Sequence, residues 1–127
     1  MVFNTDISCN SQGTNANIKF HILDDKIMER EHFIKSNDNY VLYKHIPILQ
    51  SLEAYIKYDI PEELLTIMVL DDDFGQPYDY QYFIGVALKE EKPIKKELID
   101  LKNFMEDLIL HLQDVGILSG YNKGDII

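Results

Sequence analysis

The stretch "PIKKELIDLKNFMEDLILHLQDVG", from Pro93 to Gly116, has the clearest pattern in the sequence. Its apolar residues recur at spacings of four and three, which is the period of one face of an α-helix. They are Ile94, Leu98, Leu101, Met105, Leu108, Leu112 and Val115. Pro93 suits a first helical turn and Gly116 suits a C-terminal cap. The pattern therefore predicts a long amphipathic helix over residues 94–115.

The apolar face of this helix is wide, because Ile99, Phe104 and Ile109 extend it beyond the narrow seam of a coiled coil. A wide face favours packing against a sheet. Pairing of two such helices from two copies of the chain is the alternative.

The residues before this helix favour short strands. Residues 17–23 alternate between apolar and polar side chains, which predicts a half-buried strand. Residues 26–35 suit either a second strand of a hairpin or a short helix, and we favour the strand. "SNDN" at 36–39 is a turn cluster, and "YVLYK" at 40–44 has the composition of a third strand. A small antiparallel meander results.

The middle of the chain changes its period. Residues 47–58 place Ile48, Leu52 and Ile56 at spacings of four, which predicts a helix. Pro61 and the two glutamates after it favour one helical turn, which would lead into a buried strand formed by "LLTIMVL" at 64–70.

Three aspartates, Asp71 to Asp73, end this buried run, because each carboxylate costs several kcal/mol to bury without a partner. They therefore mark the surface. Residues 78–88, "YDYQYFIGVAL", return to the fold either as a helix or as a strand. In the second case Tyr78, Tyr80 and Tyr82 would share one face.

These elements predict the α+β class, with a small antiparallel sheet packed against two or three helices and a long C-terminal amphipathic helix. The length of 127 residues and the hydrophobic content of 46% fit a single domain over 1–127. Residues 1–16 are rich in Asn, Ser and Thr without an apolar period, so we expect a loose N-terminal arm.

The chain has no apolar run near the ~20 residues that a membrane helix needs, and its start lacks the order of a signal peptide. Cys9 is the only cysteine, which excludes an internal disulfide. We expect a cytoplasmic protein that does not bind membranes.

No catalytic or metal-binding motif is complete. "DFG" at 73–75 lacks the glycine-rich loop and catalytic loop of kinases. Counted from Asp71, a calcium loop would need glycine at its sixth position and glutamate at its twelfth, and neither is present. The four histidines, at 21, 32, 45 and 111, lack metal-ligand spacing. We expect no enzyme activity, no cofactor and no bound metal.

The charge distribution is the unusual feature of this sequence. The net charge of −10 argues against direct binding of nucleic acid. Acids and tyrosines gather between Lys57 and Lys89, where there is no basic residue, and they suit a basic protein partner. The predicted partner-binding residues are Glu62, Glu63, Asp71, Asp72, Asp73, Tyr78, Asp79, Tyr80 and Tyr82. Alternatively, the tyrosines belong to the core and the acids only confer solubility.

In size, acidity and lack of catalytic motifs, the chain resembles small acidic bacterial and phage inhibitors, including toxin immunity proteins. The resemblance implies a binding protein that neutralises a basic partner, such as a nuclease toxin whose nucleic-acid site it occludes. The alternative is a non-catalytic structural or regulatory module that dimerises through the 94–115 helix. The protein is then a monomer or a homodimer.

Overall fold

The computed structural model describes residues 7–8, 18–48, 51–73 and 75–124. They form eight strands and three helices, in an α+β arrangement that confirms the predicted class. In chain order these are β1 (Ile7–Ser8), β2 (Lys19–Phe20), α1 (Asp25–Arg30), β3 (Ile34–Ser36), β4 (Asn39–His45), β5 (Leu52–Asp59), β6 (Leu64–Asp71), β7 (Gln76–Pro77), α2 (Tyr80–Lys89), α3 (Lys96–Asp114) and β8 (Leu118–Ser119).

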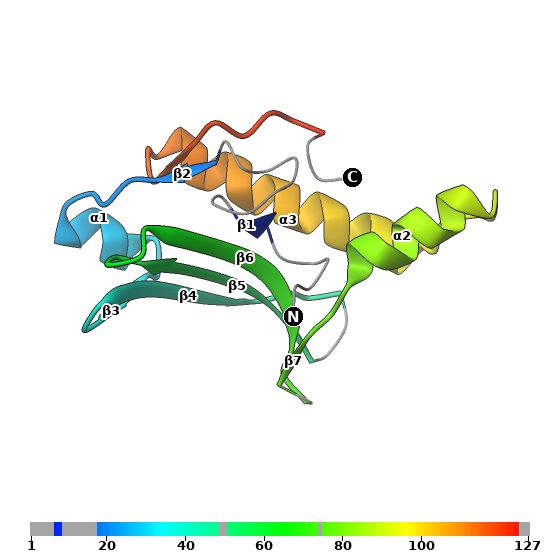
Figure 1. The fold of residues 1–127 in the computed structure, drawn as a ribbon, viewed down its shortest axis with the longest axis horizontal. Coiled ribbons are helices and arrows are strands. Elements are labelled where there is room, and N and C mark those ends of the chain that lie inside the picture. The colour runs from blue at the N-terminus through cyan, green and yellow to red at the C-terminus, as the bar shows by residue number, and fades with distance from the viewer. Residues whose placement is uncertain (1–6, 9–17, 49–50, 74, 125–127) are drawn as a thin grey trace.

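The main sheet is antiparallel and has the strand order β1-β6-β5-β4-β3, with β7 also paired to β6. Strands β3 to β6 follow one another as a meander (Figure 1). The predicted turn at 36–39 and the predicted strand at 40–44 are confirmed, since β3 and β4 flank Asn37 and Asp38.

The three long strands alternate between a buried face and a more exposed face. Ala54, Ile56 and Ile67 are fully buried. Tyr55 and Met68, their neighbours in sequence, point the other way and are only half-buried. The sheet therefore has an inner face that belongs to the core and an outer face that does not.

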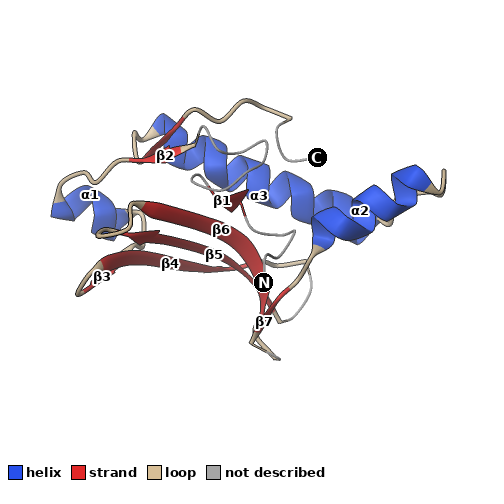
Figure 2. Cartoon of the chain, viewed as in Figure 1, coloured by secondary structure: helices blue, strands red, loops and turns tan. Residues whose placement is uncertain are grey.

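Helix α3 covers the inner face. Figures 1 and 2 show it lying across the sheet, and no described element lies on the opposite side. Its buried apolar residues are Leu98, Leu101, Met105, Leu108, Ile109 and Leu112. The predicted long helix that packs on a sheet is confirmed, with a start at Lys96 rather than at Ile94.

Helix α3 ends at Asp114 with Val115 as its C-cap, and Gly116 follows as the predicted capping glycine. Gly116 has φ +96° and donates its N–H to the Gln113 carbonyl, and Ile117 donates to Leu112. These two bonds form a Schellman motif, which requires the left-handed conformation that glycine adopts at low cost.

The helix predicted over residues 47–58 is wrong, because Leu52–Asp59 is strand β5. Leu52 and Ile56 are four residues apart, a spacing that fits one helical face but also one face of a strand. Ala54 between them is buried as well, which completes the alternation of a strand.

Residues 26–35 also differ from the favoured strand. Helix α1 occupies Asp25–Arg30, and the Asp24 carboxylate caps it by accepting a hydrogen bond from the Ile27 N–H at 3.0 Å. The N-cap bond satisfies a donor that the helix itself leaves open, which favours the helix. The strand predicted over 17–23 is shortened to β2, and it pairs with β8 rather than with the main sheet.

The predicted helical turn after Pro61 is wrong, because residues 60–63 form the hairpin turn between β5 and β6. The Asp59 carboxylate accepts the Glu62 N–H at 3.1 Å and holds this turn. The buried strand that follows is confirmed as β6. For residues 78–88 both a helix and a strand were open, and helix α2 occupies all of them except Tyr78 and Asp79, which precede it.

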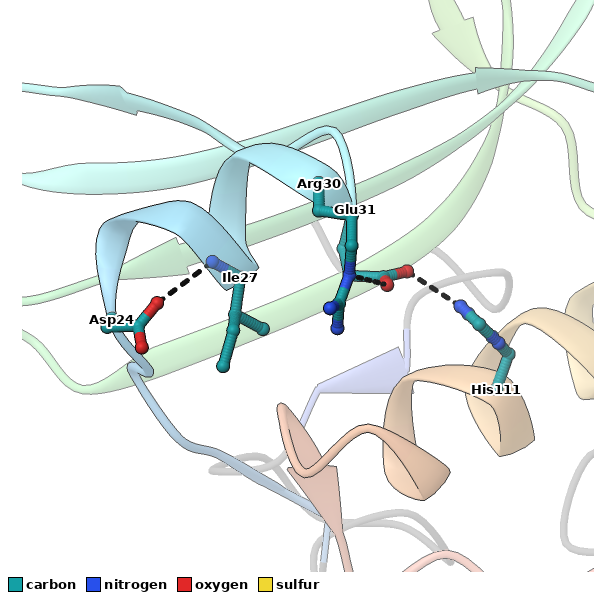
Figure 3. A network of polar contacts seen from close by, with 5 residues as sticks. All are labelled: Asp24, Ile27, Arg30, Glu31 and His111. Atoms are coloured by element: carbon teal, nitrogen blue, oxygen red, sulfur yellow. Dashed lines mark hydrogen bonds and ion pairs between the residues drawn. The ribbon is translucent and has the colours of Figure 1, made fainter.

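A polar network joins α1 to α3 (Figure 3). The Glu31 carboxylate lies 2.6 Å from His111 Nε2 on α3 and 3.3 Å from Arg30 Nε. Burial raises the pKa of Glu31, but the hydrogen bonds and charges of His111 and Arg30 outweigh it, so the pKa falls below its ordinary value. His111 thus has a structural partner on a distant segment of the chain.

The C-terminal segment is fastened to α3 by a buried carboxylate. Glu106 accepts a hydrogen bond from the Tyr121 hydroxyl at 2.5 Å and another from the Gly124 N–H at 2.6 Å. Gln113 adds two bonds to the Tyr121 backbone. Burial raises the pKa of Glu106, but these bonds, with the charges of Lys102 and Lys123, bring it below the usual value.

The predicted N-terminal arm, 1–16, is described only at Ile7–Ser8, which forms β1 against Thr66 and Ile67 of β6. The rest of the arm, with Cys9, lies outside the described residues.

Candidate functional site

The acidic turn, which we define as Asp71, Asp72 and Asp73, ends strand β6. The Asp71 carboxylate accepts the Asp73 N–H at 3.1 Å, and the Asp72 N–H donates to the Ser51 carbonyl at 2.7 Å. These bonds hold the backbone, while the Asp72 and Asp73 side chains are exposed. The structure thus places these carboxylates at the surface, as the sequence predicts.

Strand β7 returns from this turn to the start of α2, where Asp79 is the N-cap. Its carboxylate accepts the Tyr82 N–H at 2.9 Å. Asp79 therefore has a structural role, because it satisfies an open donor at the positive end of the helix. Its charge still lies close in sequence to the acidic turn.

Three rings gather at this end of α2, and we call Tyr78, Tyr82 and Phe83 the aromatic corner. The Tyr78 and Phe83 ring centroids lie 5.8 Å apart, and those of Tyr82 and Phe83 lie 5.7 Å apart. Tyr82 is 52% exposed and Phe83 is 47% exposed. Two large aromatic side chains are thus accessible beside the aspartates.

Tyr80 does not belong to this surface, and its prediction as a contact residue is wrong. It is 0% exposed, and its hydroxyl finds no hydrogen-bond partner within the described parts of the chain. In a strand, Tyr80 would have shared a face with Tyr78 and Tyr82, but a helix turns each successive residue by about 100°. Of the two alternatives for residues 78–88, the helix is the observed one, and it removes Tyr80 from the face that the strand would have given it.

Negative charge converges on Tyr78. Burial raises the pKa of its hydroxyl, and the charges of Glu97 and Asp71 raise it further. Glu97 lies in the first turn of α3 and Asp71 at the end of β6. Acids from two elements therefore lie near the aromatic corner. The sequence pattern indicated Asp71 but not Glu97.

Glu62 and Glu63 are exposed but lie at the other end of β6, in the turn that precedes it. An eight-residue strand separates them from the acidic turn, which corresponds to roughly 20–25 Å. A single small loop that contacts a partner cannot include both the two glutamates and the aspartates of the acidic turn. The predicted acidic interval is thus two separate surfaces in the structure.

A groove between α2 and α3 adjoins the aromatic corner, and the sequence reasoning missed it. Its volume is about 860 Å³, and Tyr78 and Phe83 of the aromatic corner are among the residues that line it. The remaining lining residues are Val86, Ala87, Glu90, Lys92, Pro93, Lys95, Lys96, Glu97 and Leu98. Lys92 is paired with Glu90 at 2.8 Å and Lys96 with Asp100 at 3.4 Å. The groove could have been predicted only if α2 and α3 had been expected to lie side by side.

Within residues 7–8, 18–48, 51–73 and 75–124, no three His, Cys, Asp or Glu side chains are grouped so that they could hold a metal ion. No helix in the same residues is long and apolar enough to cross a membrane. The described site thus consists of exposed acids, exposed aromatic rings and a groove of mixed charge.

Comparisons of the chain with protein-family models, with curated proteins and with solved structures found no match.

Proposed function

We propose that this protein is a cytoplasmic binding protein that neutralises a basic protein partner through the acidic turn and the aromatic corner. The partner we favour is a nuclease toxin, whose nucleic-acid site the bound protein would occlude. Such a protein is an immunity or inhibitor protein and not an enzyme.

The observation that supports this proposal is the pairing of two chemistries on one surface. Asp72 and Asp73 are exposed at the end of β6, and Tyr82 and Phe83 are exposed at the start of α2. Carboxylates attract a basic surface over long range, whereas aromatic rings supply contact area after the encounter. Tyr82 and Phe83 replace Tyr80 as the expected anchors.

The alternative function, dimerisation through residues 94–115, would use an apolar stripe that mostly lies in the core. Six of its side chains are buried against the rest of the fold, and of the large apolar ones on α3 Ile99 is exposed. We therefore favour the acidic surface.

A matched pair of variants tests the proposal. Asp72→Asn with Asp73→Asn removes two exposed charges from the acidic turn, and Glu62→Gln with Glu63→Gln removes two from the far end of β6. The immobilised wild-type protein would first isolate a basic partner from the native host. Association rates of all three proteins would then be measured at low and high salt.

We expect the aspartate variant to associate more slowly and with a weaker salt dependence, because the long-range attraction is lost. The glutamate variant should associate like the wild type. Equal rates for both variants, with the fold intact, would contradict the assignment of this surface. For a nuclease partner, loss of nuclease inhibition should follow the same order.

A further inference from the structure

The outer face of the main sheet carries an accessible apolar row. The register aligns Tyr43 of β4, Tyr55 of β5 and Met68 of β6 side by side across the sheet. Tyr43 is 54% exposed, and its ring lies 5.1 Å from that of Tyr55. No described helix or strand lies over this face (Figure 1). We call these three residues the middle row.

The two flanking rows carry opposite charges on the central strand. Glu53 lies two residues before Tyr55 and Lys57 two residues after it, so both side chains share the outer face. They lie about 13 Å apart along the strand, which is too far for a direct ion pair. Within the described residues neither forms an ion pair.

The other strands continue this arrangement with compatible side chains. His45 and Leu70 lie beside Glu53 in one flanking row, and Val41 and Thr66 lie beside Lys57 in the other. Ile34 of β3, which is 66% exposed, extends the second row. Leu70, Val41 and Ile34 thus add apolar area beside Glu53 and Lys57. Asp59, two residues after Lys57, shares the outer face at the hairpin end of β5, where its carboxylate accepts the Glu62 N–H.

We propose that this face binds a second copy of the chain, with a two-fold axis that crosses the strands along the middle row. Such an axis reverses the strand direction and places each residue of the middle row opposite its own copy. Two sheets packed face to face lie about 10 Å apart, which allows the side chains of both faces to meet. The interface is isologous, as in most homodimers.

Charge complementarity selects a second copy as the occupant. In this arrangement Glu53 of one protomer faces Lys57 of the partner subunit, and the symmetry forms the same pair twice. The spacing of acid and base around Tyr55 makes the face complementary to itself. Packed sheets are rotated relative to each other by about 30°. This rotation displaces residues near the axis less than residues at the strand ends, so Glu53 and Lys57 of the two protomers remain close enough to pair.

The proposed dimer does not depend on the proposed function. The acidic turn and the aromatic corner follow β6 and lie outside the middle row, so one surface can fail its test while the other passes. The dimer would present two copies of the partner-binding surface.

Charge reversal tests the interface. Sedimentation velocity over micromolar to submillimolar concentrations should show a concentration-dependent dimer of the wild-type protein. Glu53→Lys and Lys57→Glu should each lower the dimer affinity by at least tenfold, because each places two pairs of like charges opposite each other. The double variant Glu53→Lys with Lys57→Glu should recover most of the affinity.

A mixture of the two single variants provides the sharpest control. At positions 53 and 57, Glu53→Lys carries two bases and Lys57→Glu carries two acids, so a heterodimer should form more readily than either homodimer. Thermal unfolding of each variant checks that the fold is intact. A monomer at every concentration, or a dimer that is insensitive to both single substitutions, would overturn the proposal.

Discussion

The two faces of the main sheet come from the same strands but differ in how they are used. The inner face is buried under α3, with Ile56 and Ile67 fully inaccessible. The outer face leaves Tyr43 and Tyr55 in contact with solvent. Alternating side chains supply both faces at once, so the position of the helices decides which face becomes core.

This difference separates stability from recognition in the molecule. Residues of the inner face hold the fold together, and the groups that fasten α3 and the C-terminal segment support them. Residues of the outer face contribute less to folding and are accessible for binding. Substitutions on the two faces should therefore produce different phenotypes.

The largest effect is expected from neighbouring residues on β6. Ile67→Ala removes a fully buried side chain and should lower the free energy of unfolding by about 2–5 kcal/mol. Met68→Ala, the matched control on the outer face, should cost about 1 kcal/mol or less. Urea unfolding measures both values. Similar losses for the two variants would mean that the outer face is also packed.

The next largest loss of stability is expected at Glu106 of α3, the helix that covers the inner face of the sheet. Glu106→Gln should cost about 1–3 kcal/mol at neutral pH, because it weakens the buried bonds to Tyr121 and Gly124.

The pH dependence of this loss follows from the lowered pKa of Glu106. The folded protein holds the carboxylate in its charged form, so its contribution is complete above the ordinary pKa of 4.5 and is lost as pH falls through the lower folded value. The difference between wild type and Glu106→Gln should therefore shrink on acidification below 4.5. A difference that stays constant down to the acid unfolding of the protein would contradict this role.

A smaller effect is expected where α3 ends. Gly116→Ala should cost about 1–2 kcal/mol, because alanine at φ +96° is strained. A Cβ at this position would lie 3.7 Å from the Leu23 Cδ1 atom, an ordinary contact, so the cost is conformational rather than steric. Gly85→Ala is the control, since a Cβ there meets no atom within 4 Å; it should stabilise α2 slightly. Equal effects of both substitutions on the melting temperature would disprove the cap.

The smallest effect on stability is expected on the outer face. Tyr43→Ser should change the free energy of unfolding by about 1 kcal/mol or less, since the side chain is half exposed. The same substitution should weaken self-association, because it removes an aromatic side chain from the proposed interface. Calorimetric unfolding and sedimentation of one sample would compare the two quantities. A large loss of stability without any change in self-association would mean that Tyr43 serves the fold rather than an interface.

The candidate site was only partly predictable from the sequence. The end of β6 at Asp71 was predicted because buried carboxylates are costly, and the structure places Asp72 and Asp73 at the surface. The inward orientation of Tyr80 was not predicted, because it follows from a helix where the tyrosine alternation suggested a strand face. The groove between α2 and α3 exists because these two helices are neighbours in the fold, and the local sequence does not indicate which helices will be neighbours.

The sequence alone determined the long helix α3, because its apolar period extends over five turns and no strand shares it. It also determined the net charge of −10, since charge is set by composition. Only the tertiary structure decided that Leu52–Asp59 is a strand. The spacing of Leu52 and Ile56 fits both a helical face and a strand face. The pairing of β5 with β4, which places Tyr55 and Lys57 on the outer face of the sheet, resolves the ambiguity. The described helices lie on one face of the sheet and none of them lies over the other, and that arrangement depends on long-range packing that no short segment encodes.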